Sequence, residues 1–181
     1  CALGLATPMS ITVGMGRGAQ MGVLIKNAES LENFEKVDIL IIDKTGTLTV
    51  GKPTVKKIIT ASHYQEDEIL CLAASLEQNS EHPLACAIIK LAIERHLPLQ
   101  TIHDFSSEMG KGVHGTVNGQ RIALGNVKLL ELFNLQPETL TEEANKLREE
   151  GETVMFLIVN NEIAGLISAA DPIKETTAAA L

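Results

Sequence analysis

A carboxylate follows an apolar run early in the chain, at a place where it can do chemistry. The run, residues 37–42, is rich in branched apolar side chains and favours a buried strand of a parallel sheet, although so short a run also fits a buried helical segment. Open α/β sheets bind ligands just outside the carboxyl ends of their strands, so we expect the Asp43 side chain at the rim of a crevice. An aspartate carboxylate there can act as a covalent nucleophile and become an aspartyl-phosphate.

The residues after Asp43 suit the binding of an anion. Gly46 lets the chain turn sharply, and the amides and hydroxyls of Thr45 and Thr47 can face a negatively charged group. An Asp that merely caps a turn is common after a strand, and for an isolated Asp that interpretation is the better one. The residue types alone leave both interpretations open.

The complete string over residues 43–49 favours chemistry over a plain turn. It is Asp-Lys-Thr-Gly-Thr-Leu-Thr and resembles, residue for residue, the phosphorylation motif of P-type ATPases. The resemblance implies that Asp43 accepts the γ-phosphate of ATP. It also implies that the Asp43 carboxylate and the Thr45 backbone carbonyl hold Mg²⁺, while Lys44 and Thr45 hold the phosphate.

A second ligand-binding string lies between two expected helices. Apolar residues recur at helical spacing over residues 66–78 and 83–95, and Pro83 suits a first helical position. The start of the second helix offers free amides and the positive end of the helix dipole. A histidine at such a helix start is more often a cap or a surface residue than a ligand contact.

Residues 80–85, Ser-Glu-His-Pro-Leu-Ala, resemble the nucleotide-binding motif of the heavy-metal P-type ATPases. The resemblance implies that Ser80, Glu81 and His82 belong to a nucleotide site in which His82 packs against the adenine. It also implies that Glu77, five residues upstream of His82, forms a hydrogen bond with the edge of the adenine.

A glycine-rich segment follows farther along the chain. Asn118-Gly119 between two alternating runs predicts an antiparallel hairpin of residues 112–117 and 120–124. The lone Gly-x-Gly at its start fits a bulge or turn by itself. The family resemblance implies that Gly110 and Gly112 line the nucleotide and let it approach the backbone closely. It also implies that Gly125 and Asn126 belong to the same nucleotide pocket.

The remaining pattern after residue 50 predicts further strands and helices. We expect a strand over residues 55–60, a helix over 127–133, a helix that begins at a capping box over 139–142 and ends at Gly151, and a hairpin of 153–159 and 162–168. We expect the resulting antiparallel sheet to carry its helices on one side.

The first fourteen residues are apolar and uncharged. As a helix they would span about 21 Å, short of a hydrocarbon core of roughly 30 Å, and Arg17 and Lys26 follow them. We therefore expect residues 1–14 to be the C-terminal part of a membrane helix, with an ordinary buried helix as the alternative. A short strand over 23–25 and an amphipathic helix over 28–35 are expected next.

Residues 1–8, Cys-Ala-Leu-Gly-Leu-Ala-Thr-Pro, resemble the second half of the membrane metal site of copper-transporting P-type ATPases. Cys1 matches the last Cys of the Cys-Pro-Cys triplet of that site, and a thiolate suits soft Cu(I). Cys1 by itself is an incomplete copper site.

The last motif is Asp-Pro-Ile-Lys, residues 171–174. A plain turn, with Asp171 as a helix N-cap and Pro172 as the first helical residue, is the simpler interpretation. The string also resembles the hinge through which P-type ATPases return to their phosphorylated domain, which implies hinge roles for Asp171 and Pro172. A helix is expected over 176–181.

Composition limits the classes of partner. The formal net charge is −8 and aromatic residues make up 3% of the chain, which excludes nucleic acid as the main partner, because phosphate backbones are bound by basic clusters and single strands by aromatic platforms. The three cysteines contain no Cys-x-x-Cys and form no disulfide framework, which fits a reducing cytoplasm.

These features predict an α/β fold. The resemblance to P-type ATPases implies that it consists of a partial haloacid-dehalogenase-like (Rossmann-like) phosphorylation domain that carries an inserted α+β nucleotide-binding domain with an antiparallel sheet. We expect part of a membrane helix at residues 1–14, the first part of the phosphorylation domain at 15–49, the nucleotide-binding domain at 50–168, and the return hinge with the start of the second part at 169–181.

The resemblance implies ATP-driven export of Cu(I), or of Ag(I), through an aspartyl-phosphate. It implies ATP and Mg²⁺ as cofactors, and copper, the membrane and a copper chaperone as partners. The parent protein would lie in the cell membrane, with this part mostly in the cytoplasm. The family's further Thr-Gly-Asp, Lys and Gly-Asp-Gly-x-Asn-Asp elements do not occur after Asp43. We therefore expect this chain alone to bind ATP weakly and to turn it over poorly or not at all.

Two other functions stay open at this point. A soluble haloacid-dehalogenase-like phosphatase also uses an Asp at a strand end, but it has a second Asp two residues later, where this chain has Thr45. A non-catalytic nucleotide-binding module needs only residues 50–168. Binding of ATP without labelling of Asp43 would favour the module.

Overall fold

The protein is described by a computed structural model that covers residues 3–61, 63–137 and 140–181. Its contacts divide the chain into two compact units, residues 1–42 and 43–181, and each unit is described by itself. Cys1 lies outside the described residues.

The first unit contains two helices, α1 (Leu3–Gln20) and α2 (Ala28–Phe34). Helix α1 continues six residues beyond the expected end at Gly14. Gly22, two residues after its last helical residue, has a left-handed φ of 82°, and the Val23 amide donates to the Gly18 carbonyl at 2.8 Å. None of the helices in the described ranges combines the length and the apolar character that crossing a membrane requires.

Two expected strands do not form in this unit. The expected strand over 23–25 is wrong, because the Val23 amide closes the end of α1. The expected strand over 37–42 is also wrong: these residues are irregular, and Ile39 and Ile41 are 81% and 92% exposed. A parallel strand needs neighbouring strands at its edges and helices over its faces, and the described part of this unit contains helices but no strand. The helix expected over 28–35 is confirmed as α2, which the Asn27 side chain caps.

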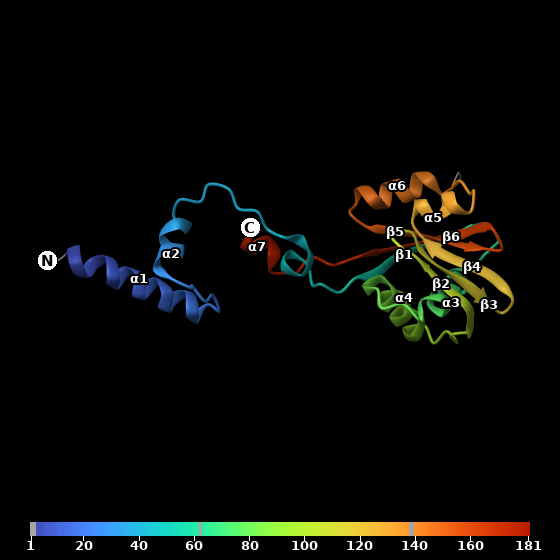
Figure 1. Ribbon diagram of the computed structural model, residues 1–181, viewed down its shortest axis with the longest axis horizontal. Helices are drawn as coiled ribbons and strands as arrows, with labels where there is room; N and C mark the ends of the chain where they lie inside the picture. The colour runs from blue at the N-terminus through green and yellow to red at the C-terminus, as the bar shows by residue number, and fades with distance from the viewer. Residues whose placement is uncertain (1–2, 62, 138–139) are drawn as a thin grey trace. The chain divides into compact units, whose positions relative to one another are not determined.

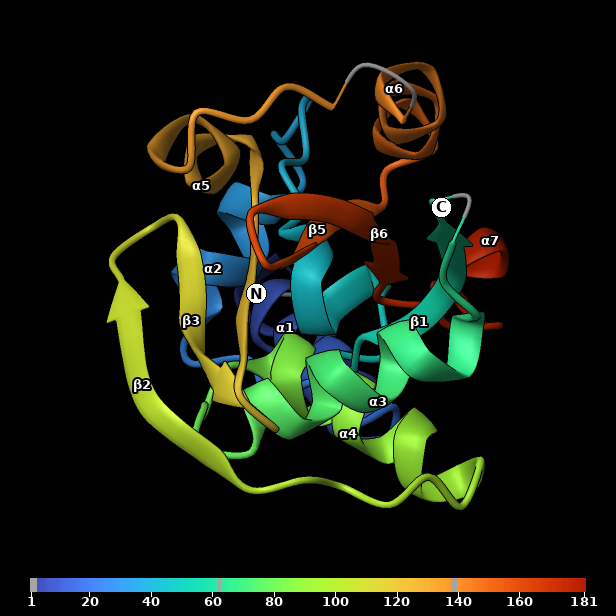
Figure 2. The ribbon, with the colours of Figure 1, turned by 90° about the vertical axis from the view of Figure 1, so that its right-hand side faces the viewer.

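The second unit is built on a six-stranded sheet in the order β1-β6-β5-β4-β3-β2 (Figures 1 and 2). All five pairings are antiparallel. The strands are β1 (Thr54–Thr60), β2 (Ile102–Glu108), β3 (Gly112–Val117), β4 (Gln120–Gly125), β5 (Thr153–Val159) and β6 (Glu162–Ala170).

Helices cover both faces of this sheet, so the expectation of helices on one side is wrong (Figure 2). Helices α3 (Glu66–Glu77) and α4 (Pro83–Glu94) pack on one face, and α5 (Val127–Leu132) and α6 (Thr141–Glu149) pack on the other. Strand β5 shows why. Its side chains alternate between the faces, and Leu157 joins the core with α3 and α4 while Phe156 joins the core with α5 and α6. A strand that is apolar on both faces needs cover on both.

The two predicted hairpins are confirmed. Asn118 and Gly119 join β3 to β4 with φ of 50° and 77°, as a tight turn between twisted strands requires. Asn160 and Asn161 do the same between β5 and β6. The edge strand β2 was not predicted, because its sequence is mostly polar and a register shift interrupts its pairing with β3.

The helix ends follow local rules, with one correction. Gly151 ends α6 in the left-handed region with φ of 82°, as expected. The N-cap of α6 is Leu140, which makes no side-chain cap bond, and Thr139 of the expected capping box lies outside the described residues. The expected helices over 66–78, 83–95 and 127–133 are confirmed as α3, α4 and α5.

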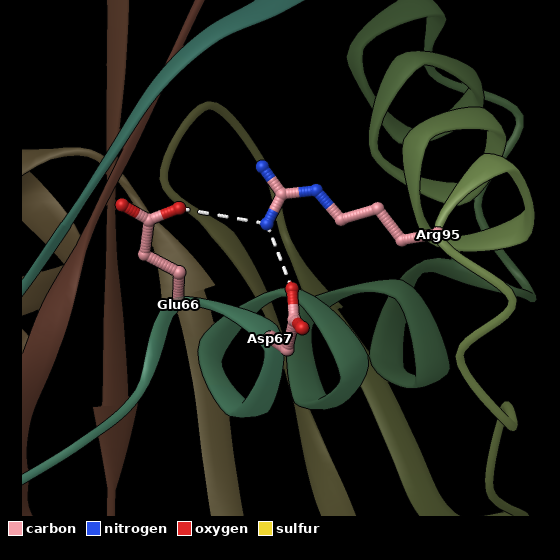
Figure 3. Close-up of polar contacts among 3 residues, drawn as sticks. All are labelled: Glu66, Asp67 and Arg95. Atoms are coloured by element: carbon pink, nitrogen blue, oxygen red, sulfur yellow. Dashed lines mark hydrogen bonds and ion pairs between the residues drawn. The ribbon is translucent and has the colours of Figure 1, made fainter.

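An ion-pair cluster joins α4 to α3 (Figure 3). Arg95, the C-cap of α4, contacts Asp67 at 2.7 Å and Glu66 at 3.5 Å, both in the first turn of α3. Acidic groups are favoured in a first helical turn, so the cluster also suits the dipole of α3. The three side chains are partly exposed, and such pairs contribute about 0 to 1 kcal/mol. The apolar contacts between the two helices therefore stabilise this pair more than the charges do.

Candidate functional site

Asp43 opens a single wide turn, residues Lys44–Leu48, which the Thr49 amide closes by donating to the Lys44 carbonyl at 3.2 Å. The Asp43 backbone is extended, with φ of −65° and ψ of 137°, and the side chain is exposed and makes no cap bond to the turn. A plain capping aspartate would bond the amides of the turn with its carboxylate. This carboxylate is instead available to a ligand.

Gly46 gives the turn its shape. Its φ of 78° is left-handed, which side chains other than glycine rarely adopt. Thr45 before it is extended rather than helical, with ψ of 121°. Thr45 and Thr47 are both exposed, so the hydroxyls that the sequence assigned to an anion are accessible.

A segment from the far end of the chain holds this turn in place. We call residues 171–177 the return segment. Thr49, which is 1% exposed, donates its hydroxyl to the Asp171 carboxylate, and the Asp171 Oδ1 accepts from the Gly51 amide at 2.9 Å and from the Lys52 amide at 3.1 Å. Asp171 is therefore not a helix N-cap, and that interpretation is wrong. The following helix is α7 (Thr177–Ala180), with Thr176 as its N-cap.

The return segment also contacts the turn through two residues whose contacts were not foreseen. The Lys174 ammonium donates to the Gly46 carbonyl at 2.9 Å, and the buried Thr177 hydroxyl donates to the Leu48 carbonyl at 2.7 Å. Lys174 belongs to the Asp-Pro-Ile-Lys string, so the sequence marked it as a residue of interest. Its partner could not be predicted, because Gly46 lies 128 residues away in the sequence. Thr177 carried no signal in the sequence.

His82 caps α4. Its Nδ1 accepts from the Leu84 amide at 3.2 Å, and its own amide donates to the Ser80 hydroxyl at 3.3 Å. Because Nδ1 is used by the Leu84 amide, Nε2 is the ring nitrogen left for another partner, and the side chain is exposed. Glu81 is exposed beside it. His82 is thus a cap, as its position suggested, and its exposed side chain is still accessible to a ligand.

Glu77 is a buried carboxylate in the last turn of α3. Its exposed fraction is 6%, and its Oε2 is buried without a hydrogen-bond partner. Burial raises the pKa of Glu77, and the Ser80 hydroxyl and the His82 ring partly offset that rise. An unpaired buried acceptor is costly to the fold, so a ligand that donates a hydrogen bond to it would recover that cost.

Glu77→Gln should raise stability near neutral pH, by roughly 1 kcal/mol, because the neutral amide removes a buried charge. Because the pKa of Glu77 is higher in the folded chain than its ordinary value near 4.5, its contribution to the free energy of unfolding is greatest below that value. This contribution is lost as the pH rises through the raised pKa, where the folded chain must bury the charged carboxylate. Urea unfolding of the chain between pH 4 and 8 should show stability falling with pH more steeply in the wild type than in Glu77→Gln. The exposed Glu81→Gln is the control and should match the wild type. A Glu77→Gln variant that is less stable at pH 7 would contradict this expectation.

The glycine positions meet at one end of β3 and β4. Gly112 pairs with Gly125, and a Cβ on Gly125 would lie 2.2 Å from the Lys111 carbonyl oxygen. Asn126 joins the group, since its Nδ2 donates to the Gly110 carbonyl at 2.9 Å and its Oδ1 accepts from the Lys128 amide at 2.9 Å. Both glycines are therefore required by backbone contact, whatever they bind.

The site residues thus form three local groups: Asp43 with its turn, the string from Glu77 to His82, and the glycines with Asn126. The second and third groups border one core, because Leu76 packs in the same cluster as Val113 and Leu124. The described contacts do not join the first group to the other two.

Two further observations concern ligands. A cavity of about 530 Å³ lies elsewhere, lined by residues that include His114, Arg121 and Phe133, and no predicted site residue lines it. The described buried atoms without a partner lie outside its lining, so we assign it no role. Within the described ranges, no three His, Cys, Asp or Glu side chains form a metal cluster.

A family model decides the classification. The model for haloacid dehalogenase-like hydrolases matches residues 37–181. The chain belongs to this family. The match covers both the Asp43 turn and the inserted antiparallel sheet, and it confirms the predicted fold class of a haloacid-dehalogenase-like domain with a nucleotide-binding insert.

Relatives within the family are metal-transporting P-type ATPases, which confirms the resemblance inferred from the motifs. The whole chain is 52% identical to 22% of a "Copper-transporting P-type ATPase" of Rhizobium leguminosarum bv. viciae. It is 48% identical, again over the whole chain, to 22% of a "Silver exporting P-type ATPase" of Salmonella typhimurium. The chain therefore spans about a fifth of the length of these curated relatives.

The crystal structure of a zinc-transporting PIB-type ATPase in the E2.Pi state is similar in fold. It superposes with a TM-score of 0.81 at 36% identity, over 99% of this chain and 29% of that one. The identity to the copper and silver relatives is higher than the identity to this zinc transporter.

Proposed function

We propose that the chain is the central part of an ATP-driven exporter of Cu(I) or Ag(I) that works through a phosphorylated aspartate. The observation that carries the proposal is Asp43, an exposed carboxylate without a cap bond that opens the seven-residue string of the P-type ATPases. The identity over the whole chain to a copper transporter and a silver exporter supports the choice of a soft monovalent cargo.

The Asp43 carboxylate oxygen attacks the γ-phosphorus of ATP in line with the bond to the leaving oxygen. The new oxygen–phosphorus bond forms as the bond to ADP breaks, and ADP keeps the electron pair. Lys44 and Thr45 hold the phosphoryl oxygens. Water then hydrolyses the aspartyl-phosphate, and the change between the two states moves the metal across the membrane.

Mg²⁺ fits the residues present. The Asp43 carboxylate and the Thr45 carbonyl are oxygen donors, and Mg²⁺ in phosphoryl-transfer sites is held by one or two carboxylates and the substrate phosphates rather than by a protein cage. Bound there, it neutralises the charge of the phosphates during transfer.

The nucleotide is bound by the other two groups. Glu77 accepts a hydrogen bond from the adenine edge with its unpaired Oε2, and His82 packs against the ring. Ser80 and Glu81 belong to the same nucleotide site, and the backbone at Gly110, Gly112, Gly125 and Asn126 lines the approach. Adenine offers the donor that the buried Glu77 oxygen lacks.

The domain boundaries of this proposal follow the motifs. Residues 1–14 belong to a membrane helix whose Cys1 is one ligand of the transported metal, and 15–49 and 169–181 belong to the phosphorylation domain. Residues 50–168 form the nucleotide-binding domain, with Asp171 and Pro172 as the hinge. The parent protein lies in the cell membrane, this part faces mostly the cytoplasm, and a copper chaperone delivers the metal.

A phosphatase is the weaker alternative, because Thr45 stands where a phosphatase has its second Asp. A non-catalytic ATP-binding module stays the second candidate for the chain in isolation. It is favoured by the lack of a described contact between the Asp43 turn and the nucleotide residues.

Inside-out membrane vesicles that contain the full-length protein should take up Cu(I) or Ag(I) only when ATP is added. His82→Ala should raise the ATP concentration for half-maximal uptake by about tenfold, the size of one lost ring contact, with little change in the maximal rate. The exposed His63→Ala serves as the control. Uptake that needs no ATP, or that His82→Ala leaves unchanged, would contradict the proposal.

A further inference from the structure

The return segment holds the Asp43 turn at more places than a linker needs. Its backbone contributes two hydrogen bonds, from the Lys174 amide to the Leu48 carbonyl and from the Val50 amide to the Pro172 carbonyl, each 2.9 Å long. Asp171 and Thr177 add side-chain bonds that keep the two segments together. The Lys174 side chain is therefore not required to join them.

The backbone bonds involve Leu48 at the end of the turn and Val50 just after it, whereas the Lys174 ammonium contacts its middle. The ammonium donates to the Gly46 carbonyl at 2.9 Å, three residues after Asp43. A bond from a charged donor is stronger than one between neutral groups. Gly46 is the one residue of the turn without a Cβ, so its φ and ψ angles are the least restricted in the turn. Lys174 thus holds the peptide that follows the glycine, where the backbone of the turn is sterically least restricted.

The Gly46 carbonyl and the Thr47 N–H belong to the same planar peptide, so a bond that fixes the carbonyl also fixes the direction of the N–H. The peptide bond is trans, so the Gly46 carbonyl and the Thr47 N–H point in opposite directions. When Lys174 holds the carbonyl, the Thr47 amide is aimed away from Lys174. Without the ammonium, the peptide can rotate and carry the amide with it.

We propose that Lys174 is a positioning residue for phosphoryl transfer to Asp43, because its hold on the Gly46 carbonyl fixes the direction of the Thr47 amide in the phosphate-binding turn. The inference rests on the proposed function, since it concerns the same turn. Lys174 acts through the backbone and does not touch the reacting atoms.

The first test measures the rate of phosphorylation of the full-length protein at saturating ATP. Lys174→Met should slow this rate by about tenfold to a hundredfold, the effect of a binding group displaced by about 1 Å, without changing the ATP concentration for half-saturation. Lys174→Arg keeps the charge and the donor and should restore most of the rate. Lys56→Met removes an exposed lysine of β1 and is the matched control, expected to behave as the wild type.

The second test needs no activity. In the 181-residue chain, the amide resonance of Thr47 should shift in Lys174→Met and not in Lys56→Met or Lys174→Arg. Wild-type rates in Lys174→Met, or an unmoved Thr47 amide, would overturn the inference. A melting temperature that falls equally in Lys174→Met and Lys174→Arg, with equal loss of rate, would reduce Lys174 to a structural role and overturn it as well. If the wild-type protein itself is not phosphorylated, the proposed function fails, and the Thr47 amide still decides the inference.

Discussion

Asp43→Asn should abolish the acid-stable label that the full-length protein acquires from ATP with a radioactive γ-phosphate. The amide of asparagine is nearly the same size as the carboxylate but is not a nucleophile, so no aspartyl-phosphate can form. Loss of a covalent nucleophile lowers turnover by roughly 10⁶-fold in a serine protease, and a comparable loss leaves only background here.

The control for this experiment is Asp38→Asn, which removes an exposed carboxylate five residues upstream. That variant should be labelled as strongly as the wild type. Both variants should still bind ATP, because the proposed nucleotide residues lie at the ends of α3, α4, β3 and β4, and no described contact joins them to the Asp43 turn. A label that persists in Asp43→Asn would place the phosphoryl group on another residue and contradict the assignment of the site.

Gly125→Ala should destabilise the second unit by about 3 kcal/mol or more. A Cβ at this position would lie 2.2 Å from the Lys111 carbonyl oxygen, 2.7 Å from Leu129 Cδ2 and 2.9 Å from Gly112 Cα. Two of these three neighbours are backbone atoms of the adjoining loop and strand, which cannot rotate away as a side chain can. The end of the β3–β4 ladder would have to open. Thermal or urea unfolding of the chain measures the loss.

Gly119→Ala is the matched comparison at the other end of the same two strands. A Cβ there meets nothing within 4 Å, so only the φ of 77° penalises the change. We expect a loss of about 1 kcal/mol, as for a left-handed alanine. A loss in Gly125→Ala no larger than that in Gly119→Ala would contradict the expected clash, because Gly125 has no left-handed φ that could account for a loss by itself. Since Gly125 also belongs to the predicted nucleotide site, loss of ATP binding in Gly125→Ala would have to be compared with the loss of fold.

The parts of the fold that were predicted correctly depend on local sequence. Asn118-Gly119 fixed one hairpin, because only a few residue types adopt the left-handed conformations of its turn. Pro83 and the apolar spacing after it were enough to place α4. The strand predicted over residues 37–42 failed for the opposite reason. An apolar run becomes a parallel strand only beside other strands, and the run itself carries no information about them.

The candidate site was predictable to the same extent. The strings around Asp43 and His82 identified two groups of residues, and their local geometry could be anticipated from Gly46 and Pro83. The contacts made by Lys174 and Thr177 join positions more than a hundred residues apart, and no pattern in either segment names the other. The buried state of Glu77 was equally hidden, because a glutamate at a helix end is ordinarily exposed.

The chain enters and leaves the sheet of the second unit at adjacent points, because Thr54 at the start of β1 pairs with Ala170 at the end of β6. Just outside that pair, the Asp171 carboxylate accepts from the amides of Gly51 and Lys52. A lobe whose entry and exit coincide can be added to or removed from a host protein without stretching it. Residues 53–170 are therefore a transplantable unit, and Asp171 stays with the host, where it accepts from Gly51 and Lys52. Joining the two cut ends with a short Gly-Ser bridge would leave the host's own backbone nearly undisturbed, and the excised lobe would keep every strand of its sheet.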